Sequence, residues 1–146
     1  MPQYEMLDRF FKLRRAINIH AIQRLKGSGI SPKQAGLLRC VDAHGTVSLA
    51  ELAKMTVSDP AAITRAVDGL VNRKLLEKKD SPTDRRTFEL RLSAAGKHIV
   101  SRIKDIQESI AKDIFSVFSP KEREHFISLL DKVLEEFKST AKERKE

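Results

Sequence analysis

Residues 48–92 decide the fold, and they read SLAELAKMTVSDPAAITRAVDGLVNRKLLEKKDSPTDRRTFELRL. The stretch opens on a serine with a glutamate three residues later, a capping box in which each side chain binds the other residue's backbone amide. This pattern predicts a short helix over 48–56. Asp59 and Pro60 then supply a cap and a helix-initiating proline, so a tight turn should lead into a second helix over 60–73.

A β-hairpin is predicted after the second helix. Residues 76–80 can be extended, residues 81–84 are of types favoured in turns, and residues 87–92 alternate between polar and apolar. One face of the second strand holds Phe88, Leu90 and Leu92, and the other holds Thr87, Glu89 and Arg91. The hairpin should therefore lie with one face on a core.

Short helix, turn, second helix and hairpin, in this order, predict a winged helix-turn-helix lobe. At about 100° per residue, the helix over 60–73 has two chemically different faces. The apolar face holds Ile63, Ala66, Val67 and Leu70. The opposite face holds Ala61, Arg65, Asp68 and Asn72, with Thr64 at the border. Such a helix can pack against the lobe and present small and polar groups to a major groove.

The side chains near the start of this helix suit base recognition. Arginine binds guanine O6 and N7, and alanine or threonine methyl groups contact the thymine methyl. We therefore expect Ala61, Thr64 and Arg65 to reach bases, whereas Asn72 lies farther along and should meet the DNA backbone or solvent. Because phosphates repel a carboxylate, Asp68 is expected to pair with Arg65 or with an arginine of the hairpin.

The tip of the hairpin carries Asp84-Arg85-Arg86. An arginine there can enter a narrow minor groove, where the potential is most negative, and the aspartate can hold it in place. The residues predicted to contact DNA are Ser58, Pro60, Ala61, Thr64, Arg65, Arg85 and Arg86. The residues predicted to form supporting salt bridges are Asp68 and Asp84.

Helices are predicted on both sides of this stretch. One covers residues 4–26, and a capping box at Ser31 and Gln34 starts another that ends near His44 and Gly45. A strand can form at Thr46 and Val47. A long helix follows Ser93, with isoleucines at 99, 103, 106, 110 and 114, and a last helix begins at a capping box formed by Ser119 and Glu122.

The first and last helices carry more apolar surface than one small lobe can cover, so we expect a homodimer, although the isoleucine ladder could also be internal core.

The expected organisation is a lobe over 31–95 with helical dimerisation regions over 1–30 and 96–146, in one continuous folded unit. The fold class is mainly α with a small β-hairpin wing. A two-fold dimer would place its two reading helices about one DNA turn apart, on a pseudopalindromic operator.

Composition is compatible with this assignment. The net charge of +8 favours a polyanionic partner, and the four scattered histidines include no metal-binding pair. We expect no metal and no cofactor. No apolar run is long enough for a membrane span or a signal peptide, so a cytoplasmic location is expected. The single cysteine, Cys40, lies among apolar residues and fits a core position better than a redox sensor.

The chain resembles the MarR family of bacterial regulators over nearly its whole length. The resemblance rests on LAELAK at 49–54, PAAITRAVD at 60–68, the wing Asp84-Arg85-Arg86, and LRLSAAG at 90–96. It implies a dimer formed by the first and last two helices, with Arg65 reading bases and Arg85 or Arg86 in the minor groove. Gly69 and Lys74 depart from the family pattern, which usually has a larger polar residue and a glycine there.

The expected function is sequence-specific regulation of transcription, as a repressor released by a small-molecule effector. The effector rests on the resemblance, since members of the family bind small aromatic or anionic compounds between the dimer helices and the DNA lobe. Three alternatives remain at this stage: a non-specific architectural DNA-binding protein, a helical protein-interaction module, and an enzyme. The last is the least favoured, because no catalytic constellation, phosphate loop or metal motif is present.

Overall fold

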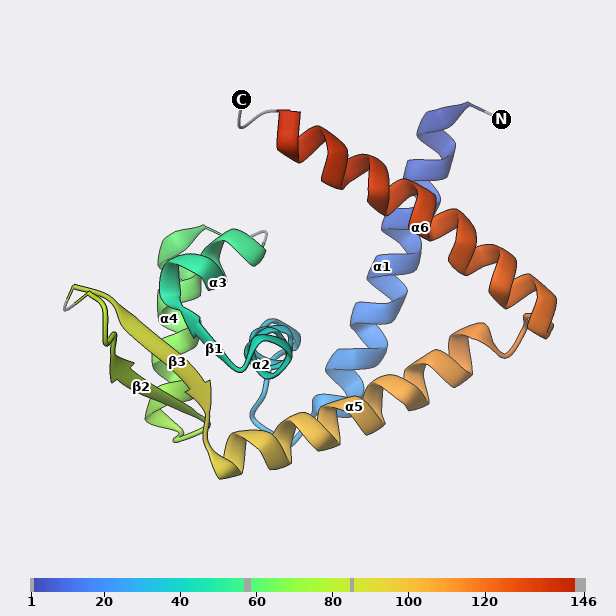
Figure 1. Cartoon of the computed structure of the whole chain (residues 1–146). Helices are drawn as coiled ribbons and strands as arrows, with labels where there is room; N and C mark the ends of the chain where they lie inside the picture. Colours follow the sequence, from blue (N-terminus) through green and yellow to red (C-terminus); the bar gives the residue numbers. More distant parts are fainter. Residues whose placement is uncertain (1, 57–58, 85, 144–146) are drawn as a thin grey trace. The chain divides into compact units, whose positions relative to one another are not determined.

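The computed structural model of the chain describes residues 2–56, 59–84 and 86–143, with side chains as far as residue 140. Six helices and three strands follow one another in the described residues (Figure 1). They are α1 (Gln3–Leu25), α2 (Pro32–His44), β1 (Thr46–Ser48), α3 (Leu49–Met55), α4 (Pro60–Asn72), β2 (Leu76–Asp80), β3 (Phe88–Leu92), α5 (Ala94–Phe115) and α6 (Pro120–Glu143). The predicted fold class is confirmed.

The chain divides into two compact units, Met1–Ile110 and Ala111–Glu146, and the boundary falls within α5. The lobe expected over 31–95 lies wholly inside the first unit, and its limits as a separate domain remain a prediction. None of the helices in the described part of the chain is both long enough and apolar enough to cross a membrane.

All three predicted capping boxes form. In each, the serine hydroxyl accepts the amide hydrogen three residues on, and the side chain at that position accepts the serine amide hydrogen. The pairs are Ser31 with Gln34, Ser48 with Glu51, and Ser119 with Glu122. The hydrogen bonds from the backbone and side chain of Ser119 lower the pKa of Glu122. These caps fix where α2, α3 and α6 begin.

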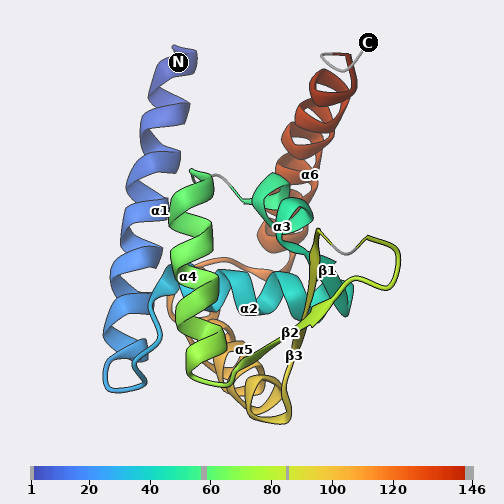
Figure 2. The same cartoon turned by 90° about the vertical axis from the view of Figure 1, so that its left-hand side faces the viewer.

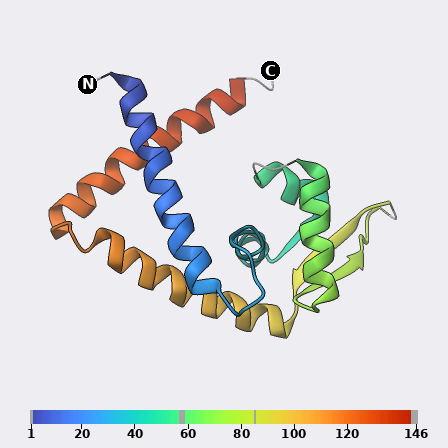
Figure 3. The same cartoon turned by 180° about the vertical axis from the view of Figure 1, so that it is seen from behind.

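The first unit is organised around α2, which contacts α3, α4, β1 and β3. The strands form one antiparallel sheet in the order β1-β3-β2, with Val47 opposite Leu90 and Leu76 opposite Leu92. Helix α4 packs beside β2 (Figure 3). The largest fully buried side chains of the unit are Leu37, Leu38, Val41, Leu52, Ile63, Leu70, Leu90 and Val100. One core therefore holds helices, sheet and the start of α5 together.

Phe88 is not part of the core, although the alternation places it on the same face of β3 as Leu90 and Leu92. Leu90 and Leu92 are 1% and 8% exposed, but Phe88 remains 38% exposed. It is the first residue of β3, paired with Asp80 at the wing end of the hairpin and so beyond the lobe core. The ammonium group of Lys78 lies 3.9 Å from the centre of its ring, a cation–π contact in place of core packing.

The isoleucine ladder of α5 faces inward. Ile103 and Ile110 are buried, and Ile99 and Ile106 pack against the core of the first unit. In the second unit, the rings of Phe115, Phe118 and Phe126 pack with centroids 5.4 to 6.0 Å apart. Large apolar side chains are exposed on α1 and α6 instead. They are Tyr4, Met6, Leu7, Phe10, Phe11, Ile19 and Ile22 on α1, and Ile127, Leu129, Val133, Leu134 and Phe137 on α6.

Two helical glycines occupy opposite environments. A Cβ added at Gly69 would lie 3.4 Å from the side-chain nitrogen of Gln34, an ordinary contact. A Cβ at Gly96 would lie 2.1 Å from the carbonyl oxygen of Leu75, which no side chain tolerates. Gly96 therefore allows the first turn of α5 to approach the backbone that follows α4.

We predict opposite effects for the same substitution at these two sites. Gly69→Ala should stabilise the protein by about 1 kcal/mol, because alanine favours the helical backbone and its methyl group fits. Gly96→Ala should destabilise it by at least about 2 kcal/mol, because the methyl group would displace backbone. Urea denaturation at one fixed protein concentration measures both. Equal effects of the two substitutions would contradict the packing described.

Candidate nucleic-acid interface

The start of α4 is fixed by local interactions. Asp59 is the N-cap residue, and its carboxylate accepts the amide hydrogen of Ala62 at 3.0 Å. Pro60 occupies the first helical position, where its missing N–H costs no hydrogen bond. These interactions fix the residue at which α4 begins, so the side chains of its first turn have defined positions.

Burial separates the two faces of α4 as the helical wheel predicted. Ile63, Val67 and Leu70 are 1%, 3% and 0% exposed and belong to the lobe core. Ala66 is half-buried against that core. The outer face is exposed, and it holds Pro60, Ala61, Thr64, Arg65, Asp68 and Asn72. The predicted reading residues are thus accessible on one side of α4. Figure 2 shows the ribbon of this helix beside α2.

The polar groups of this face differ in what they bind. The Thr64 hydroxyl donates to the carbonyl oxygen of Pro60 at 3.0 Å, which leaves its oxygen lone pairs and methyl group available. Among the described residues, no hydrogen bond or ion pair is recorded for Arg65 or for Asp68. The ion pair predicted between Asp68 and Arg65 is thus not formed here, and a pair with Arg85 lies outside the described residues.

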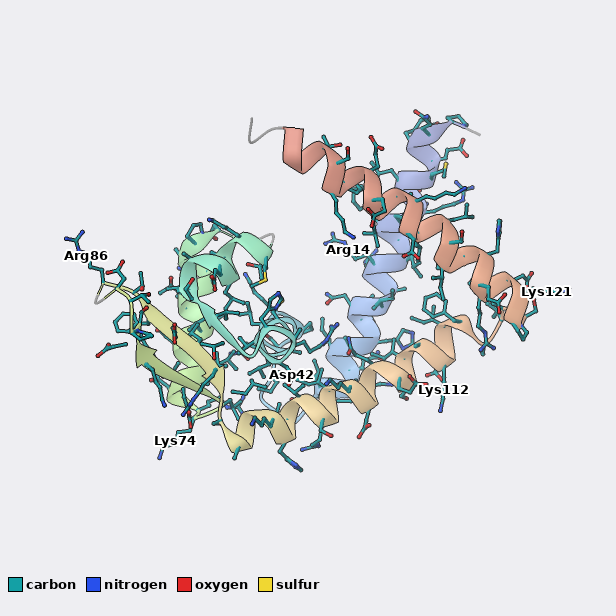
Figure 4. The ribbon with its side chains drawn as sticks, viewed as in Figure 1. Arg14, Asp42, Lys74, Arg86, Lys112 and Lys121 are labelled. Atoms are coloured by element: carbon teal, nitrogen blue, oxygen red, sulfur yellow. The ribbon has the colours of Figure 1, made fainter. Side chains whose placement is uncertain are left out.

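The wing tip is ordered by Asp84 through the backbone. Its carboxylate accepts the amide hydrogen of Arg86 at 2.9 Å, and its carbonyl oxygen accepts the amide and hydroxyl hydrogens of Thr87. This carboxylate therefore stabilises the tip through the backbone, and its predicted salt bridge with a wing arginine stays a prediction. Arg86 is exposed and projects from the tip of the hairpin (Figure 4). Ser58 and Arg85, two predicted contact residues, lie outside the described residues.

The wing strands add cations that sequence reasoning did not single out. Lys78 and Lys79 are exposed on β2, and Lys78 is held over the Phe88 ring. The Arg91 side chain pairs with Glu77 across the hairpin, with Nε 2.6 Å from Oε2. In the sequence, these lysines appear only as part of the run Glu-Lys-Lys-Asp at 77–80. This run does not show which of its charged side chains form ion pairs. The lysines extend the basic surface from the tip along the wing.

A cavity of about 740 Å³ lies beside α2 in the first unit. Its lining combines the apolar side chains of Leu37 and Ile63 with the cationic side chains of Lys33 and Arg39. Cys40 also lines it and is half-buried against the core, as expected for a small apolar residue. The described residues contain no group of histidine, cysteine and acidic side chains suited to a metal ion.

The family model described as "MarR family" matches residues 28–87, which span the helix-turn-helix and the wing. The curated transcriptional regulator MhqR of Bacillus subtilis is 27% identical over 119 residues, covering 82% of this chain and 82% of MhqR. The helix-turn-helix and wing of this chain are similar to those of the MarR family.

Solved structures share the fold of this chain. A cysteine-to-serine variant of MarR from E. coli, in complex with operator DNA, superposes on this chain with a TM-score of 0.75. It is 20% identical and the match covers 92% of this chain and 99% of that one. BpsR of Bordetella bronchiseptica, whose DNA binding is regulated by 6-hydroxynicotinic acid, is 29% identical, with a TM-score of 0.71 and coverage of 86% and 98%.

A lysine in the left-handed conformation follows the end of α4. Lys74 has a φ of 58°, and its amide donates to the carbonyl oxygen of Val71. The amide of Leu75 donates to Leu70, which completes a Schellman motif. Position 74 therefore has the left-handed backbone conformation that suits glycine, although it is occupied by a lysine.

Replacing this lysine should relieve the strain. We predict that Lys74→Gly stabilises the protein by about 0.5 to 1 kcal/mol, because glycine has no Cβ to oppose a positive φ. Lys79→Gly, a matched loss of a lysine within a regular strand, should instead destabilise it by a similar amount. Urea denaturation of the two variants tests this difference. A less stable Lys74→Gly protein would contradict the left-handed conformation.

Proposed function

We propose that this chain is a MarR-family regulator that binds a pseudopalindromic duplex operator as a homodimer, represses transcription there, and is released by a small-molecule effector. The observation that carries the proposal is the division of α4, whose inner face is buried in the lobe while Ala61, Thr64 and Arg65 are exposed. The E. coli MarR structure with operator DNA and a relative described as the transcriptional repressor MdtR support it.

Dimerisation is supported by the exposed apolar side chains of α1 and α6. Phe11 is 55% exposed and Phe137 is 71% exposed, and each lies in a row of further apolar residues on its helix. Exposed apolar surface of this extent is unfavourable in water and is typical of a protein interface. A second copy of the chain can cover the apolar side chains of both helices. Two-fold symmetry then places a second reading helix on a second half-site.

Each reading helix enters a major groove. Arg65 donates to guanine, while Ala61 and Thr64 contact bases close to the start of α4, and Pro60 and Ser58 approach the adjoining backbone. Arg85 or Arg86 enters the flanking minor groove from the wing tip, and Asp84 supports the tip. Asp68 pairs with an arginine once phosphates lie nearby.

The effector site in this proposal is the cavity beside α2. Its apolar wall suits an aromatic ring, and Lys33 and Arg39 suit an anionic substituent. Support comes from BpsR, whose DNA binding is regulated by 6-hydroxynicotinic acid. A ligand there lies between α2 and Lys104 of α5, and it can change how the lobe is held.

Arg65→Ala should relax base preference. Losing a bidentate contact to guanine costs about 1 to 3 kcal/mol, whereas binding to random duplex should change little. Competition between a selected operator and random duplex measures the ratio. The matched control is Arg102→Ala, which removes an exposed arginine from α5. An unchanged ratio for Arg65→Ala would contradict the placement of α4, and binding without preference in the wild type would indicate an architectural protein.

Replacing Arg85 and Arg86 together by alanine should weaken binding and flatten its salt dependence. If both neutralise DNA charge, the slope of log K against log salt should fall in magnitude by about 1 to 2. Fluorescence anisotropy over a salt series measures it. The double variant Lys97→Ala with Arg102→Ala removes the same charge from α5 and should leave the slope nearly unchanged. Equal slopes for the two double variants would reject the wing contact.

A further inference from the structure

The end of α4 is tied to the turn that follows α1 by one side chain. The guanidinium group of Arg73 donates from Nη1 to the carbonyl oxygen of Gly29 at 2.6 Å, and from Nη2 to that of Ser28 at 3.0 Å. The partners lie 44 and 45 residues away in sequence. A forked pair of donors on two successive carbonyl groups fixes both position and orientation.

The turn is shaped to receive this group. Gly29 has a φ of +72°, and a Cβ added there would lie 3.1 Å from Nη1 of Arg73. The Ser28 hydroxyl donates to the carbonyl oxygen of Leu25 and accepts the amide hydrogen of Ile30. The turn is therefore held by its own hydrogen bonds, and both carbonyl groups remain directed at the arginine.

The same corner is also tied to α5. The Ser93 hydroxyl donates to the carbonyl oxygen of Lys74 at 2.6 Å, and its amide donates to that of Leu75 at 3.1 Å. It also caps α5 by accepting the amide hydrogen of Gly96. Residues 73–75 thus connect the end of α4 to the end of α1 and to the start of α5.

We infer that Arg73 is a positioning residue that sets the direction of α4 relative to α1, and so the half-site spacing that the dimer reads. This inference rests on the proposed function, in which α1 contributes to the dimer and α4 reads DNA. Arg73 and Pro60 are about 20 Å apart along the helix. A tilt of about 10° at the anchored end would move the reading end by about 3 Å, close to the rise of one base pair.

The competing role for an exposed arginine is simple attraction to phosphate, and Arg73→Lys separates the two. Lysine keeps the charge and loses the fork, so phosphate attraction survives while the paired contact to Ser28 and Gly29 is lost. Arg73→Ala removes both. The matched control is Arg102→Lys, the same exchange at an exposed position of α5. Thermal unfolding establishes that each variant is folded before it is compared.

The first measurement needs no DNA. Hydrogen exchange of the amides of residues 27–30 should accelerate about tenfold in Arg73→Lys and Arg73→Ala, and stay at the wild-type rate in Arg102→Lys. Wild-type exchange rates in both Arg73 variants would overturn the tether. This result is independent of whether the protein binds an operator.

The second measurement uses a duplex that the wild-type protein selects from a random library, with versions lengthened or shortened by one base pair at the centre. The wild type should bind the altered versions about tenfold more weakly, and Arg73→Lys should discriminate severalfold less with an unchanged salt slope. Wild-type discrimination by Arg73→Lys would overturn the positioning role. A wild-type protein that selects no duplex would instead overturn the proposed function.

Discussion

Everything about the candidate interface depends on the burial of one face of α4. The helix has 13 residues, too few to be stable in water without packing. Ile63, Val67 and Leu70 supply that packing, and each fully buried side chain contributes about 2 kcal/mol. Since the helical period is 3.6 residues, anchoring this face turns Ala61 and Arg65 outward. Presenting groups to DNA is thus a consequence of how the lobe packs.

The two ends of α4 have different tasks. At its start, Asp59 caps the helix and the exposed side chains of the first turns are available to a ligand. At its end, Arg73 and Ser93 connect the backbone to neighbouring elements by hydrogen bonds. Movement at the anchored end is amplified at the reading end by the length of the helix. This arrangement offers a physical route by which a change at α1 or α5 can alter DNA binding.

Local patterns in the sequence predicted most of the fold. Capping boxes, the proline at the start of α4 and the alternation in β3 involve residues close in the chain, so spacing alone reveals them. The exposure of Phe88 was not predicted, because alternation assigns a face but does not say where the core ends. The inward direction of Ile103 and Ile110 was left open for a similar reason, since periodicity does not identify the surface that covers an apolar row.

The candidate site was predictable only in part. The exposed face of α4 followed from the helical wheel, whereas the contact from Arg73 to Gly29 joins residues 44 positions apart and has no local signature. The requirement for glycine at position 96 was equally unpredictable, because it comes from the carbonyl oxygen of Leu75, which is distant in the sequence. The Asp84 carboxylate accepts the amide hydrogen of Arg86, a contact that was not predicted, and its predicted pair with an arginine stays a prediction.

The most direct test of the central claim is a crystal structure of the protein with a duplex that it has selected. We expect two copies related by a two-fold axis, each with α4 in a major groove and with Ala61, Thr64 and Arg65 in contact with base edges. A complex in which α4 lies away from the DNA, or in which those three side chains contact only protein, would contradict the claim.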